Sequence, residues 1–192
     1  MYSQDRLQEN HGGVFYIPDF MPGYEATLQF QRLWDTLEWE RRPDAPRRED
    51  WQNDYGVPYT YGRGAGKRTY EAKPWDYVAR RWMLELNAQY GFELDCCFIN
   101  GYETKRDALG WHADDSPEMR ADQPVISLSL GGERDLETRS NATGATQRYR
   151  LASGSVLIMP PGFQQTHQHR IPKAGYEVPP RISLTYRSLV QQ

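Results

Sequence analysis

The sequence lacks any long apolar run. No stretch approaches the roughly 18 consecutive apolar residues of a membrane-spanning helix, and the opening segment MYSQDRLQEN has no apolar signal core. Cysteine is scarce too, because the chain has two, Cys96 and Cys97, and neighbours in an extended strand point to opposite faces. They are poor disulfide partners, which is typical of a reducing compartment. We therefore expect a soluble cytoplasmic protein, or a nuclear or nucleoid one.

The chain also lacks a basic excess. Its formal net charge is -3 at pH 7, whereas nucleic-acid-binding domains often have a pI above about 9. A local basic patch is still compatible with this total, because residues 41–81 hold ten Lys and Arg against six Asp and Glu, an excess of four positive charges. That stretch is rich in Pro, Gly and Tyr and has no sustained period. It is therefore either a functional loop or a solvated connector.

Two amphipathic stretches and a series of short β-rich runs are present. Residues 24–39 repeat apolar side chains at helical spacing, and residues 74–91 do so between Pro74 and Gly91, which are typical of helix starts and ends. The β-rich runs that follow are residues 94–102, 124–132, 148–151, 154–160 and 181–190. Such spacing is typical of an all-β sandwich or barrel. The predicted fold class is α+β, mainly β, around one core.

Histidine is scarce, with four in the chain, yet GWHADDSPEM places His112 two residues before Asp114. On an extended segment both side chains lie on one face, as chelation requires. A third ligand is available at His167 or His169 in QQTHQHRIP. Two histidines and one carboxylate form the facial triad of iron(II) oxygenases, and zinc tolerates similar ligands without oxygen chemistry. The alternative is a hydrated acidic loop that binds no metal.

Two arginines near the end of the chain indicate an anion. Arg181 and Arg187 are six residues apart in PPRISLTYRS, an even offset that places both on one face of a strand. If that face points inward, both need partners, because a buried unpaired charge is costly. Asp114 can pair with one arginine and a dicarboxylic acid with the other. Asn100 and Tyr102 share a face by the same alternation and could donate to that acid. Otherwise the arginines lie on an exposed edge strand.

Taken together, these motifs resemble the AlkB family of iron(II)- and 2-oxoglutarate-dependent dioxygenases. The matching elements are Asn-x-Tyr at Asn100 and Tyr102, His-x-Asp at His112 and Asp114, His-x-Ile-Pro from His169, and Arg-x5-Arg at Arg181 and Arg187. They occur in the family's order over roughly residues 96–188. A second block, PRREDWQNDYGVPYTYG, resembles without gaps the nucleotide-recognition lid of the animal AlkB homologues that repair alkylated DNA. The similarity then spans about three quarters of the chain.

The resemblance implies a double-stranded β-helix, or jelly-roll, core at residues 93–192. Residues 1–92 would supply helices and the nucleotide-recognition lid, about 41–72, within one compact catalytic domain. The implied iron ligands are His112, Asp114 and His169, because His169 rather than His167 precedes x-Ile-Pro. The implied 2-oxoglutarate contacts are Arg187 on the distal carboxylate, Asn100, Tyr102 and Thr185 as assistants, and Arg181 between the keto-acid end and Asp114.

For the substrate, the resemblance implies oxidative demethylation of N-alkylated bases such as 1-methyladenine and 3-methylcytosine in DNA or RNA. Dioxygen is consumed, and formaldehyde and succinate are released. The implied base contacts are Tyr59, Thr60 and Tyr61, with Tyr61 as the stacking ring. Asp115 would lie near the polar edge of the base, and Arg47 would contact the nucleic-acid strand. Phosphate contacts are expected from Arg41, Arg42, Arg47, Arg48, Arg63, Lys67 and Arg68. A monomer without membrane contact is expected.

One departure concerns Ser116, which stands where the DNA-acting relatives usually have Asp or Glu. Glu118 could substitute, and Ser183 stands where some relatives have Asn. The sequence therefore does not determine the preferred base, nor whether the substrate is DNA or RNA, single-stranded or double-stranded, nor the oligomeric state.

Two other functions are compatible with the sequence. One is a 2-oxoglutarate oxygenase that acts on a protein or small molecule, and the other is a non-catalytic binding module with structural histidines.

Overall fold

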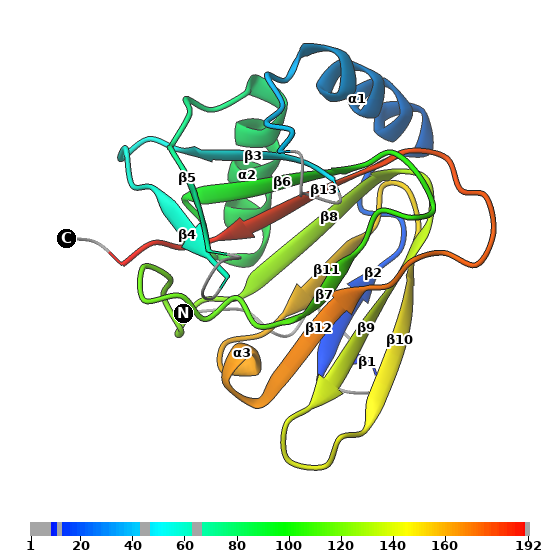
Figure 1. The fold of residues 1–192 in the computed structure, drawn as a ribbon. Coiled ribbons are helices and arrows are strands. Elements are labelled where there is room, and N and C mark those ends of the chain that lie inside the picture. Colours follow the sequence, from blue (N-terminus) through cyan, green and yellow to red (C-terminus); the bar gives the residue numbers. More distant parts are fainter. Residues whose placement is uncertain (1–8, 11–12, 43–46, 63–66, 191–192) are drawn as a thin grey trace.

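The computed structural model describes residues 9–10, 13–42, 47–62 and 67–190. Two antiparallel sheets face each other (Figure 1). The larger sheet has the order β1 (Glu9–Asn10), β2 (Val14–Ile17), β11 (Val156–Met159), β8 (Val125–Gly131), β13 (Arg181–Arg187), β6 (Cys96–Tyr102) and β3 (Arg48–Asn53). The smaller sheet has the order β10 (Thr146–Leu151), β9 (Arg134–Ser140), β12 (His167–Ile171) and β7 (Leu109–His112). A separate hairpin pairs β4 (Tyr59–Tyr61) with β5 (Arg68–Tyr70).

Two helices cover the outer face of the larger sheet, α1 (Gly23–Thr36) and α2 (Tyr77–Tyr90), and a short α3 (Phe163–Thr166) precedes β12 (Figure 1). Both predicted long helices are present. The second begins at Tyr77, later than Pro74, because the Asp76 carboxylate caps it and accepts from the backbone N–H of Val78 at 2.7 Å. Gly91 ends it in the left-handed conformation, with φ of 73°. None of the described helices is long and apolar enough to span a membrane.

The strand alternation of β13 divides the protein into an apolar layer and a polar cavity. Ile182, Leu184 and Tyr186 are fully buried and pack with the helices. The alternate residues Ser183 and Thr185, with Arg187, line the cavity between the sheets. β6 and β8, its neighbours on either side, alternate in the same way. The mainly β jelly-roll class predicted from the sequence is confirmed.

The first half of the chain contributes more to the sheets than its sequence pattern indicated. β2 and β3 join the seven-stranded sheet, so the strands of the core are not confined to residues 93–192. β3 has the sequence REDWQN, which shows no alternation of apolar and polar residues. Its polar side chains are nevertheless buried on both faces of the strand, where they form hydrogen bonds. Examples are Glu49 toward the hairpin and Gln52, which accepts from the backbone N–H of Asp76. The stretch 41–81 therefore includes a sheet edge as well as the hairpin.

The turn between β8 and β9 brings the two sheets together at the end where β13 begins. A Cβ on Gly131 would lie 2.5 Å from the Pro180 carbonyl oxygen, and one on Gly132 would lie 2.2 Å from that of Pro179. Only glycine permits so close an approach. The same turn places Arg134, the first residue of β9, near the pairing of Arg181 with Gly131.

Candidate metal and co-substrate site

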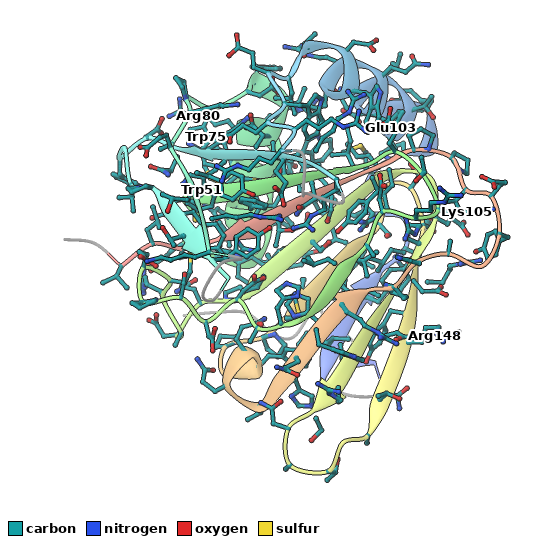
Figure 2. The ribbon with its side chains drawn as sticks, viewed as in Figure 1. Trp51, Trp75, Arg80, Glu103, Lys105 and Arg148 are labelled. Atoms are coloured by element: carbon teal, nitrogen blue, oxygen red, sulfur yellow. The ribbon has the colours of Figure 1, made fainter. Side chains whose placement is uncertain are left out.

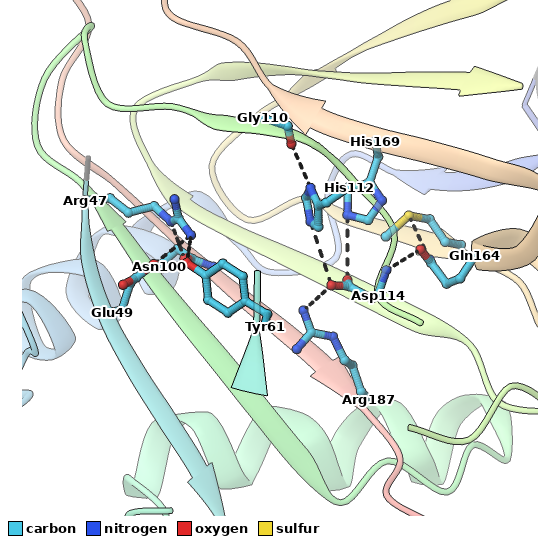
Figure 3. Close-up of polar contacts among 11 residues, drawn as sticks. Arg47, Glu49, Tyr61, Asn100, Gly110, His112, Asp114, Gln164, His169 and Arg187 are labelled. Carbon is cyan, nitrogen blue, oxygen red and sulfur yellow. Dashed lines mark hydrogen bonds and ion pairs between the residues drawn. The ribbon is translucent and has the colours of Figure 1, made fainter. Parts of the chain in front are cut away.

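Three side chains that can bind a metal meet inside the cavity (Figure 3). His112 ends β7, and its cross-strand partner is His169 on β12. Asp114 follows β7 by two residues, and its carboxylate oxygens lie 3.7 Å from His112 Nε2 and 3.6 Å from His169 Nε2. One ligand atom from each residue lies within 4.8 Å of the others. The sequence-predicted set is thus brought together.

His167 lies outside this cluster. Its ring stacks on Phe163, with centroids 4.4 Å apart, and its Nδ1 lies 2.8 Å from the Thr166 hydroxyl. The structure therefore separates the two candidate histidines in the way that the His-x-Ile-Pro match implied.

The three residues also have the protonation and free atoms that a divalent metal requires. Burial lowers the pKa of His169 to about 3 and lowers that of His112 as well. Burial opposes ionisation of Asp114, but Arg187 and the two imidazoles outweigh it and hold the pKa of that carboxyl at about 2. Neutral imidazoles and an ionised carboxylate are the metal-binding forms. The buried Asp114 Oδ2 has no hydrogen-bond partner among the described residues, so these residues fit a divalent ion.

Neighbouring groups orient two of the ligands. The Gly110 carbonyl lies 2.9 Å from His112 Nδ1, which directs Nε2 of that ring toward the cavity. The Asp114 backbone N–H donates to Gln164 Oε1 at 3.0 Å. Gln164 on α3 was not singled out from the sequence, because no local motif connects it with Asp114.

The two arginines of β13 occupy different depths, and their positions correct the sequence-based expectation. Arg187, not Arg181, lies beside the metal-binding carboxylate, and its Nη2 donates to Asp114 Oδ1 at 2.7 Å. Arg181 is fully buried and donates from Nη2 to the Ser129 hydroxyl at 2.8 Å. Within the described residues, Nε and Nη1 of Arg181 have no hydrogen-bond partner, and the same is true of Nε and Nη1 of Arg187. Strand alternation predicted that the two arginines share a face of β13. It could not predict which of them lies beside Asp114.

The β4–β5 hairpin is attached to the core by a buried polar cluster (Figure 3). Glu49 on β3 is fully buried and accepts from the Tyr61 hydroxyl at 2.8 Å, from the Tyr70 hydroxyl, and from Arg47 Nη2 at 2.7 Å. Arg47 Nε donates to Asn100 Oδ1 at 2.6 Å. Arg47 is thus committed to internal contacts, which corrects its predicted place on a nucleic-acid strand. Glu49 had no recognisable sequence signal, because two of its three donors come from a distant hairpin and the third, Arg47, precedes β3.

The other predicted substrate residues differ in their exposure to the cavity. Tyr59 and Tyr61 line it, and the Arg187 guanidinium lies 5.2 Å from the centre of the Tyr59 ring. Thr60 does not line it and instead bonds Thr69 across the hairpin at 2.8 Å. Asp115 is exposed and likewise lies outside the set of cavity-lining residues.

The predicted phosphate-binding residues are mostly engaged within the protein. Arg41 and Arg48 both pair with Glu103, at 2.9 and 3.2 Å. Arg42 donates to the Thr69 carbonyl at 2.6 Å. Lys67 is exposed, and Arg68 is half-buried with a contact of its own. Arg63 lies outside the described residues.

Close to the metal ligands, Ser116 Oγ and Glu118 Oε2 are buried without a hydrogen-bond partner among the described residues. Deeper in the cavity, the hydroxyls of Ser127 and Ser183 bond each other at 3.0 Å. Ser183 therefore fills the position where some relatives have Asn with a strand-to-strand contact. The loop after Asp114 keeps two buried acceptors free.

Comparisons with known proteins agree with this geometry. The family model of the 2OG-Fe(II) oxygenase superfamily matches residues 13–187. The chain is 28% identical over 194 residues to "Alpha-ketoglutarate-dependent dioxygenase alkB homolog 3" of Homo sapiens, covering 92% of this chain and 66% of that protein. It is 29% identical over 180 residues to "DNA oxidative demethylase ALKBH2" of Mus musculus, covering 90% of this chain and 70% of that protein.

A solved structure of OsALKBH1 superposes with a TM-score of 0.63 over 95% of this chain and 99% of that one, at 17% identity. This likeness concerns the fold. The chain spans just under two thirds of the human relative. Because the family model covers nearly all of it, the chain belongs to the 2OG-Fe(II) oxygenase superfamily, whose members use iron(II), 2-oxoglutarate and dioxygen.

Proposed function

We propose that this chain is an iron(II)- and 2-oxoglutarate-dependent dioxygenase that oxidatively demethylates N-alkylated bases in nucleic acid. The proposal rests on one observation: three metal-ligating side chains meet in a buried cavity, and the two buried arginines of β13, Arg187 beside them and Arg181, each keep two nitrogens without a hydrogen-bond partner among the described residues. Bound iron(II) and 2-oxoglutarate would supply dioxygen activation for oxidising an unactivated C–H bond. The names of the relatives, a dioxygenase and a DNA demethylase, support this activity and substrate class.

The protein's first task is to hold the metal. His112, Asp114 and His169 would be its ligands. Arg187 occupies Asp114 Oδ1 and leaves Oδ2 available, so the hydrogen bond selects which carboxylate oxygen binds the ion. The positive charge of Arg187 also keeps the carboxylate ionised.

The second task is to orient 2-oxoglutarate. We place its keto-acid end near the metal and Arg187 and its distal carboxylate at Arg181, the reverse of the assignment made from the sequence. Arg181 Nε and Nη1 are adjacent donors of one guanidinium, and a carboxylate accepts such a pair in a bidentate manner. Ser183 and Thr185 line the cavity between the two arginines. Arg47 already uses the Asn100 side-chain oxygen, so Asn100 keeps its amide N–H groups for the ligand.

The third task is to receive a base. Tyr59 and Tyr61 line the cavity from the β4–β5 hairpin, and both rings are fixed by aromatic neighbours, with Tyr61 nearly parallel to Tyr70 at a centroid distance of 5.9 Å. A base extruded from its stack could rest against Tyr61 with its methyl group directed toward the metal. A methyl group on the pairing edge weakens base pairing, so extrusion of a damaged base costs less. This favours methylated over intact bases.

The test is a mass-spectrometric survey of DNA and RNA oligonucleotides carrying 1-methyladenine or 3-methylcytosine, incubated with enzyme, ferrous salt and 2-oxoglutarate. We expect loss of the methyl group with stoichiometric formaldehyde and succinate. His112→Ala should be inactive, and His167→Ala, which changes a neighbouring histidine outside the metal cluster, should remain active. Turnover by His112→Ala would refute the metal assignment. Succinate formation without demethylation of any of these oligonucleotides would contradict the proposed substrate class.

A further inference from the structure

The end of the cavity near the start of β13 is built around Tyr102, which two buried guanidinium groups flank. The Arg181 guanidinium carbon lies 5.2 Å from the Tyr102 ring centre, and that of Arg134 lies 5.5 Å from it. Arg181 is 0% exposed and Arg134 is 2% exposed. Two cations thus lie against one aromatic ring, where each is attracted by its π system.

Arg134 is held firmly by backbone carbonyls and forms no ion pair among the described residues, although the charges of Asp107 and Asp135 act on it and raise its pKa against the effect of burial. Its Nη2 donates to the backbone carbonyls of Asp107 at 2.7 Å and Pro172 at 2.6 Å, and its Nη1 donates to that of Thr104 at 3.4 Å. These bonds join β9 to the loop after β6 and to the end of β12. Carbonyl groups satisfy the donors of a guanidinium and leave its net charge in place.

The same holds for Arg181, which donates to a neutral hydroxyl, that of Ser129. Within the part of the chain that the structure describes, no carboxylate lies within the 4.0 Å ion-pairing distance of either guanidinium. The two arginines that line the cavity differ, because Arg187 pairs with Asp114 and Arg47 with Glu49. Among the described residues, the arginines that line the cavity are thus paired with carboxylates, whereas the two guanidinium groups against Tyr102 are not.

Two buried guanidinium groups without an ion-paired carboxylate are unfavourable unless an anion binds between or beside them. Burial and the nearby charge of Arg134 lower the pKa of Arg181 to about 10. Burial lowers the pKa of Arg134 as well. This end of the cavity is thus prepared for a negatively charged group.

We propose that Arg134 is a positioning residue for the distal carboxylate of 2-oxoglutarate: it holds Tyr102 against Arg181 and adds a second buried positive charge to the site that receives this carboxylate. The inference rests on the proposed function and adds to it a residue that lies outside all four matched motifs. Arg134 spends its N–H groups on carbonyls, so it acts through charge and through Tyr102 rather than by touching the ligand. The consequence is a selectivity for a dicarboxylate over a keto acid with one carboxylate.

The test compares binding of 2-oxoglutarate with binding of 2-oxobutanoate, which has the same keto-acid end and no distal carboxylate. Dissociation constants are measured by calorimetry in the presence of Mn(II) and without dioxygen, using competition for the weaker ligand. We expect Arg134→Gln to reduce the preference for 2-oxoglutarate by about tenfold, because one charged contribution to carboxylate binding is lost. Binding of 2-oxobutanoate and of Mn(II) should change by less than about twofold.

The matched control is Arg148→Gln. Arg148 lies on β10 at the edge of the same sheet, its side chain is 66% exposed, and it pairs with Glu137 at 2.7 Å (Figure 2). Removing this equal charge should leave the preference unchanged. Arg134→Lys, which keeps the charge, should recover a larger part of the preference than Arg134→Gln does.

Equal weakening of both ligands by Arg134→Gln would assign Arg134 a structural role and overturn the inference. So would a Lys variant no better than the Gln variant. If Arg134→Gln does not fold, Arg134→Met keeps the packing against Tyr102 without the charge and gives the same comparison. Failure of the unmodified protein to bind 2-oxoglutarate would instead refute the proposed function.

Discussion

Replacing Glu49 by glutamine should destabilise the protein by about 3 kcal/mol, the lower end of the cost of leaving a buried charge without its partner. Glu49 is fully buried and accepts from Arg47, Tyr61 and Tyr70. Glutamine has nearly the same shape but cannot neutralise the Arg47 guanidinium. We choose the lower end because Arg47 would keep its bonds to the Asn100 side chain and to a backbone carbonyl.

The assay is equilibrium unfolding in urea, with the free energy of unfolding compared between variants at constant m-value. Glu103→Gln is the matched control. Glu103 pairs with Arg48 at 3.2 Å, but its side chain is 34% exposed (Figure 2), so its loss should cost less than about 1 kcal/mol. The double variant Glu49→Gln with Arg47→Met should be less destabilised than the sum of its single changes, because it removes the orphaned charge. Equal effects of Glu49→Gln and Glu103→Gln would refute the reasoning.

Three further outcomes are expected. Cys96 and Cys97 are fully buried, and burial raises the pKa of both thiols. Ellman's reagent at pH 8 should therefore modify them only as fast as the protein unfolds. Rapid labelling of the folded protein would contradict this. Gly132→Ala should cost at least about 2 kcal/mol in urea unfolding because its Cβ would meet the Pro179 carbonyl. Gly175→Ala, where nothing lies within 4 Å, should change stability by less than about 0.5 kcal/mol. Mn(II) at about 100 times its dissociation constant should stabilise the protein by about 2.7 kcal/mol, reversibly with EDTA, and an unchanged melting curve would count against the metal site.

The local periodicity of apolar residues was sufficient to predict much of the fold. Apolar spacing identified both long helices, because a helix that packs against a sheet needs one apolar stripe. Alternation on β13 identified the inward face that carries Arg181 and Arg187. It failed for β3, whose polar residues are buried by partners from distant segments, so Glu49 and Gln52 carry no local sign of burial.

The sequence by itself determined which chemical groups are available: the His-x-Asp pair, the remote histidine and two arginines on one face. Only the tertiary structure decided how they pair. It placed Arg187 against Asp114, left Arg181 without an anion beside Tyr102, and committed Arg47 to Glu49. The reason is physical, since a period of two defines the face of a strand but not the depth of a residue within the cavity. That depth depends on the register between strands far apart in the chain.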